Sequence, residues 1–158
     1  MKQSLTLTPK VRPTQKQGTM TMKLTEQKVT EQQMDEVVDI ILRIPGYLFL
    51  NANDVREMLT DRTGVLYRAS KEPCEDNRTF VTACCSDLLD KEQIQNSQYM
   101  LVNIGRVEGE ELTMEDMVII QCFLQQLGFT DLMRWGFYTK PMNETASIEI
   151  LCTNDIDP

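Results

Sequence analysis

The most constraining feature of the sequence is the alternation of strand-like and helix-like apolar segments between residues 64 and 153. Short runs rich in β-branched, aromatic and other apolar side chains predict strands, and apolar residues at helical spacing predict the helices between them. In chain order, the expected elements are a strand at 64–69, a helix at 75–89, a strand at 99–104, a helix at 113–127, and strands at 132–139 and 147–153.

This order, β-α-β-α-β-β, predicts an α/β chain of the two-layer α+β type. Crossovers between parallel strands are right-handed, so both helices are expected on one face of a four-stranded mixed sheet. Residues 140–145 contain Pro, Asn and Thr, and their number suits an antiparallel hairpin between the last two strands.

The part of the chain before this unit divides into an expected flexible basic arm at residues 1–25 and a leading helix at residues 26–45. The arm has two alternating stretches that could join a sheet edge, but its prolines and polar composition favour disorder. An apolar stripe that includes Val37 and Ile41 predicts the helix, and Pro45-Gly46 ends it.

Residues 46–158 are then expected to form the folded domain. It begins with a loop and a short helix over residues 55–60, which Asn53 or Asp54 can cap.

Charge and composition exclude several classes of function. The chain has no histidine, which removes histidine-based triads and histidine metal sites. Residues 1–30 carry a net charge of +5, and the whole chain carries −8, so residues 31–158 carry −13. Such an acidic body repels nucleic-acid phosphates. The acidic cluster at 108–116 lacks the spacing of a calcium loop, so no metal or cofactor is expected. No apolar run is long enough for a membrane span and no secretory signal is recognisable, so a cytoplasmic protein is expected.

Five cysteines are present, and no two of them have the Cys-x-x-Cys spacing of redox or zinc motifs. Without a secretory signal, reduced thiols are expected. Cys84, Cys85 and Cys122 fall in predicted amphipathic helices, where they are expected to be small buried side chains rather than nucleophiles.

Short motifs along residues 37–153 resemble, in collinear order, the C-terminal half of FtsZ, the bacterial tubulin homologue. They cover the end of that family's central helix, its synergy loop, two helix starts and two strands. The matching segments are residues 44–46 (Ile-Pro-Gly), 50–56 (Leu-Asn-Ala-Asn-Asp-Val-Arg), 75–78 (Glu-Asp-Asn-Arg), 101–105 (Leu-Val-Asn-Ile-Gly), 112–127 and 148–153.

The sequence departs from this family where the family's chemistry lies. FtsZ holds GTP with a loop of adjacent glycines, which lets backbone N–H groups approach phosphate, whereas no two glycines are adjacent here. In the synergy loop the resemblance places Phe49 at the family's Asn and Asn51 at its first acid, and only Asp54 remains acidic. GTPase activity is therefore not expected. Asp54 is expected to be either a helix cap or a residual partner contact.

The resemblance implies a non-catalytic, FtsZ-like interaction protein of cell division or the cytoskeleton, which self-associates or engages an FtsZ-type filament. The partner-contact residues expected from the synergy loop are Tyr47, Phe49, Asn51, Asp54 and Arg56. The apolar leading helix, if uncovered, would supply a further interface.

Two alternatives remain open at this point. One is a homo-oligomeric scaffold unrelated to division. The other is a small enzyme of the chorismate-mutase type, whose sites lie between subunits and need convergent Arg and Glu side chains. Arg106 and Arg134 are the arginines near predicted strand ends, although surface ion pairs are their expected role.

Overall fold

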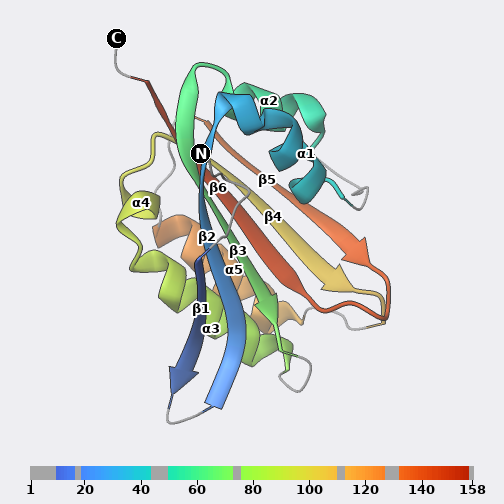
Figure 1. Cartoon of the computed structure of the whole chain (residues 1–158). Helices are drawn as coiled ribbons and strands as arrows, with labels where there is room; N and C mark the ends of the chain where they lie inside the picture. Colours follow the sequence, from blue (N-terminus) through green and yellow to red (C-terminus); the bar gives the residue numbers. More distant parts are fainter. Residues whose placement is uncertain are drawn as a thin grey trace.

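The computed structural model describes residues 10–16, 19–43, 50–72, 76–109, 113–126 and 132–156. These residues form one six-stranded mixed sheet with helices on both faces (Figure 1). The elements are β1 (Lys10–Lys16), β2 (Thr19–Thr30), the 3-10 helix η1 (Glu31–Gln33), α1 (Met34–Ile41), α2 (Ala52–Leu59), β3 (Arg62–Lys71), α3 (Asn77–Leu89), α4 (Glu92–Gln95), β4 (Tyr99–Val107), α5 (Met114–Gln126), β5 (Leu132–Lys140) and β6 (Ser147–Asp155). None of the described helices is long and apolar enough to cross a membrane.

The predicted β-α-β-α-β-β order is confirmed from β3 to β6, with the short helix α4 added after α3. The sheet has six strands rather than four, and helices cover both of its faces, so the expected two-layer arrangement is wrong. The strand order is β1-β2-β3-β6-β4-β5. The β4–β5 pair is parallel and the other pairs are antiparallel. As expected, α3 and α5 pack on each other and on one face of the sheet, around a core that includes Phe80, Cys84, Ile120 and Phe123.

The expected hairpin between the last two strands is wrong. β6 does not pair with β5; it lies between β3 and β4 and pairs with both. Residues 147–153 of β6 are buried one after another, as in a strand covered on both faces, and such a strand belongs at the centre of a sheet. The central position buries Ile150 and Leu151 on opposite faces, which a hairpin at the sheet edge would not do.

The N-terminal expectations are also corrected. β1 and β2 form an antiparallel hairpin at the β3 edge, where an arm and the start of a helix were expected. The leading helix begins only at Met34, because residues 22–30 pair in register with β3. Leu24 and Val29 are buried in the cores on opposite faces, so pairing with β3 gains apolar burial that the arm alone could not provide. Residues 1–9 lie outside the described part.

The second face of the sheet is covered at one end by α1 and α2 (Figure 1). Val37 and Ile41 of α1 pack with Val55 and Met58 of α2 over Leu66, Leu101 and Leu151 of the sheet, and all of them are buried. The apolar side of the leading helix is therefore covered within the chain. It does not supply the exposed interface that the sequence suggested.

Candidate functional site

Beyond the end of α1, the same face of the sheet is lined by polar side chains. Side chains alternate between faces along each strand, so cross-strand partners form rows on one face. The apolar row Leu66–Leu151–Leu101 lies under the helices. The next two rows, read across the sheet, are Thr25–Arg68–Glu149–Asn103 and Lys23–Ser70–Ser147–Gly105–Tyr138.

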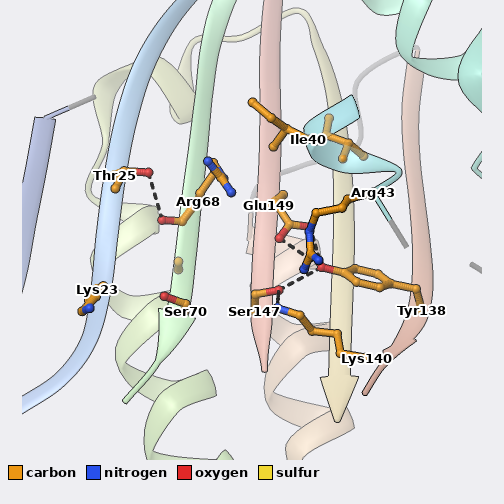
Figure 2. Close-up of a pocket in the computed structure, with 12 residues that line it drawn as sticks. Lys23, Thr25, Ile40, Arg43, Arg68, Ser70, Tyr138, Lys140, Ser147 and Glu149 are labelled. Atoms are coloured by element: carbon orange, nitrogen blue, oxygen red, sulfur yellow. Dashed lines mark hydrogen bonds between the residues drawn. The ribbon is translucent and has the colours of Figure 1, made fainter. Parts of the chain in front are cut away.

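Four side chains of β5 and β6 form a buried hydrogen-bonded network at the floor of this region (Figure 2). The hydroxyl oxygen of Tyr138 lies 3.1 Å from each carboxylate oxygen of Glu149 and 2.9 Å from Oγ of Ser147. Nζ of Lys140 donates to Oγ of Ser147 over 3.0 Å. With Glu149 ionised, the Tyr138 hydroxyl donates to it and Ser147 donates to Tyr138, which gives the network one direction.

Gly105 allows Tyr138 to take part in this network. It lies on β4, between Tyr138 on β5 and Ser147 on β6, and pairs with both. A Cβ atom at position 105 would lie 2.4 Å from Cζ of Tyr138, so only glycine leaves room for the ring to cross β4.

The C-terminal end of α1 is tied to the same network. Nδ2 of Asn103 donates to the backbone oxygen of Ile41 over 2.9 Å and to Oε1 of Glu149 over 3.3 Å. Arg43, just after α1, donates from both terminal nitrogens to Glu144 in the β5–β6 connection. The helix end is thereby placed at the rim of the polar region.

Burial sets the electrostatics of the network. It raises the pKa of Glu149, because the charged carboxylate loses water, although Ser147, Tyr138 and Lys140 offset part of the shift. Burial lowers the pKa of Lys140, and nearby Glu149 and Glu144 oppose that shift. Burial also raises the pKa of Tyr138, which stays a neutral donor at ordinary pH.

Above this floor lies a pocket of about 360 Å³ (Figure 2). Lys23, Thr25, Arg68 and Ser70 of β2 and β3 line one side of it. Tyr138, Lys140, Ser147 and Glu149 line the floor and the other side, and Ile40, Ile41 and Arg43 come from α1 and its end. The volume is in the range of small-molecule sites.

The predicted partner-contact residues lie elsewhere. Asn51, rather than Asn53 or Asp54, is the N-cap of α2, and its side chain accepts from the backbone N–H of Asp54 over 3.0 Å. Asp54 accepts in return from the backbone N–H of Asn51 over 2.8 Å, which completes a capping box. Arg56 lies 3.9 Å from Asp35, and Tyr47 and Phe49 are outside the described residues. Asn51, Asp54 and Arg56 do not line the pocket.

The arginines considered for an enzyme site do not converge. Arg134 faces α2, where its guanidinium is 3.4 Å from Glu57 and 3.8 Å from Asp54. Arg106 follows Ile104 by two positions on β4, and by strand alternation it is on the α3–α5 face. Arg43 and Arg68 line the pocket with Glu149 instead.

A sequence signal for the pocket did exist and was missed. Tyr138 and Lys140 occupy alternate positions at the end of β5, and Ser147 and Glu149 occupy alternate positions at the start of β6. Such alternation predicts one polar face on each strand. It does not by itself show that the two polar faces adjoin.

None of the four cysteines that the structure describes lines the pocket. Cys84, Cys85 and Cys152 are buried in the core on the other face of the sheet, as expected for small buried side chains. The expectation of burial is wrong for Cys122, which is exposed on α5. Within the described residues, no three acidic or cysteine side chains are grouped to hold a metal ion.

Comparison with known proteins leaves the function to be argued from the structure. No family model matches the chain, and the comparison with curated proteins returned no match. The resemblance to FtsZ therefore rests on the short sequence motifs and on the order of the elements.

Proposed function

We propose that the protein is a small-molecule-binding module whose ligand site is the pocket over β2, β3, β5 and β6. The observation that carries the proposal is the buried network of Tyr138, Lys140, Ser147 and Glu149, which forms the pocket floor. Sites of this kind combine a concave surface with a few fixed polar groups.

A purely structural role is a poor account of this network. Burying an ionisable group costs free energy, and replacing such groups with packed apolar residues is often neutral or stabilising. The adjacent row on the same face, Leu66–Leu151–Leu101, is filled with apolar side chains that pack under the helices. Here the strands instead carry a lysine and a glutamate that are each only 6% exposed. A requirement to contact a polar ligand explains why these two ionisable residues are buried here.

The test is a screen of small polar molecules by NMR amide shifts of the ¹⁵N-labelled protein. Binding at the pocket is expected to shift the amides of Gly105, Ser147 and Ser70. Ser70→Leu, which fills part of the pocket, should weaken binding strongly, whereas Ser86→Leu, at an exposed position of α3, should not. A screen without any binder, or binders that shift only residues outside the pocket, would refute the proposal.

The second candidate is a non-catalytic, FtsZ-like interaction protein that engages an FtsZ-type filament or itself. The observation in its favour is the order of the elements: a helix, a short capped helix, then β-α-β-α-β-β with α3 and α5 on one face. The burial of Val37 and Ile41 removes the uncovered helix as a reason for self-association.

Sedimentation of FtsZ polymer with GTP separates the two candidates. Co-pelleting with the filament, or a change in polymer mass, would support the interaction protein. If neither occurs, the second candidate is withdrawn.

A further inference from the structure

Positive charges outnumber negative ones among the side chains that line the pocket. Its lining contains four cationic side chains and one acidic side chain, in a protein with a net charge of −8. Arg43 is paired with Glu144, and Lys140 is held by Ser147 with Glu144 3.8 Å away. Within the described residues, no side-chain hydrogen bond or ion pair holds Lys23 or the guanidinium of Arg68. Arg68 is attracted by its cross-strand partner Glu149, whose carboxylate also interacts with Lys140.

Lys23 and Arg68 are also placed to act together. Lys23 pairs with Ser70, and Arg68 pairs with Thr25, so the two cations are diagonal neighbours on adjacent strands. Diagonal neighbours are within reach of each other's long side chains. Figure 2 shows both on the β2–β3 side of the pocket, opposite Tyr138 and Lys140.

We propose that Lys23 and Arg68 bind the oxyanion of a small organic acid or phosphate ester, and that the rest of this ligand lies over the hydroxyl groups of Ser70, Ser147 and Tyr138. The inference rests on the proposed function, since it names the ligand class of the same pocket. Arg68 supplies a planar fork that matches carboxylate and phosphate oxygens, and Lys23 supplies a point charge beside it.

Charge and size both favour this class of ligand. A carboxylate or phosphate would compensate the remaining positive charge of Lys23 and Arg68, whereas a cationic ligand would be repelled by it. A pocket of about 360 Å³ is at the small end of ligand sites, which points to a metabolite rather than a polymer.

The test is calorimetric titration with glycerate, glycerol 3-phosphate and glycerol, which share a carbon skeleton and differ in the anionic group. The two anions are expected to bind and glycerol is not, and the ratio of the two anion affinities distinguishes carboxylate from phosphate. Arg68→Gln and Lys23→Gln should each lower anion affinity about tenfold, and added salt should weaken binding.

Two matched controls remove a positive charge from the opposite face of the same sheet. Lys28→Gln makes the same change as Lys23→Gln and is also on β2. Arg106→Gln makes the same change as Arg68→Gln and is on β4. Neither control should change the affinity. An equal loss in controls and test variants would mean unspecific charge attraction and would overturn the inference.

The outcomes separate this inference from the proposed function. If glycerol and other neutral molecules bind the pocket as well as the anions do, and Arg68→Gln has no effect, the ligand class is wrong but the pocket is still a binding site. If neither these anions nor any molecule of the wider screen binds the pocket, both proposals fail.

Discussion

The ring of Tyr138 lies directly over Gly105 of the neighbouring strand. A Cβ atom at Gly105 would be 2.4 Å from Cζ and 2.7 Å from the hydroxyl oxygen of Tyr138. The missing side chain of one strand therefore makes room for the ring of the next. It is this relationship that brings the Tyr138 hydroxyl to Ser147 and Glu149 on the far side of β4.

Gly105→Ala is expected to displace Tyr138 and to open the floor of the pocket. Overpacking of this kind costs about 1–3 kcal/mol, measurable by urea unfolding. Because the cost arises from the Tyr138 ring, the same substitution in a Tyr138→Ala background should cost clearly less. Equal costs in both backgrounds would show that the ring is not the group displaced.

Glu149→Gln is expected to gain stability relative to the wild type as the pH rises. Burial raises the pKa of Glu149 above its ordinary value of 4.5, so the folded protein keeps this proton to higher pH than the unfolded chain does. The buried charge of Glu149 costs no stability below the pKa that this residue has in the unfolded chain. The cost is complete above the pKa that it has in the folded protein. Urea unfolding of both proteins from about pH 4 to about pH 8 tests the sign.

Glu144→Gln provides a control with the opposite slope. The hydrogen bond from Arg43 lowers the pKa of Glu144, so its carboxylate contributes stability above its unfolded pKa and loses it as the pH falls through the folded pKa. This variant should be less stable than the wild type at neutral pH and approach it in acid. A Glu149→Gln curve that runs parallel to the Glu144→Gln curve would contradict the assignment.

Asn51→Ala should cost about 1 kcal/mol of stability through loss of the α2 cap. Asn51→Asp keeps a capping oxygen and should restore most of it. If the protein engages an FtsZ filament, as the second candidate function proposes, and Asn51 is only a cap, neither variant changes that association at temperatures where both are folded. A filament-binding defect in Asn51→Asp at wild-type stability would instead support a partner contact.

Cys122 is expected to react first with iodoacetamide among the four cysteines that the structure describes. It is exposed on α5, whereas burial raises the pKa of Cys85 and Cys152 to about 12 and that of Cys84 well above 9.0. Thiolate is the reactive form, so the buried thiols should be labelled only on unfolding. Peptide mass spectrometry after brief labelling checks the order, and early labelling of Cys84 would contradict it.

The sequence was informative where apolar runs have the length and composition of one type of element. The helices α3 and α5 and the strands β3 to β6 were expected close to their observed positions, because each is such a run bounded by polar or turn-forming residues. The hairpin of β1 and β2 was not, because its residues are largely polar and gain stability only by pairing with β3. Residues 26–30 were assigned to a helix for the same reason: partners distant in the sequence decide their conformation.

The candidate site, too, was predictable from the sequence only in part. By itself, the sequence determined the order of the elements from β3 to β6, apart from the short helix α4, and the absence of histidine chemistry. It also placed Tyr138 with Lys140, and Ser147 with Glu149, at alternate positions on one face of each strand. Only the tertiary structure decided that β6 enters between β3 and β4, which sets Glu149 beside Arg68 and Ser147 beside Gly105. Strand order is a property of pairings across long chain separations, and local patterns do not encode which neighbour a strand takes.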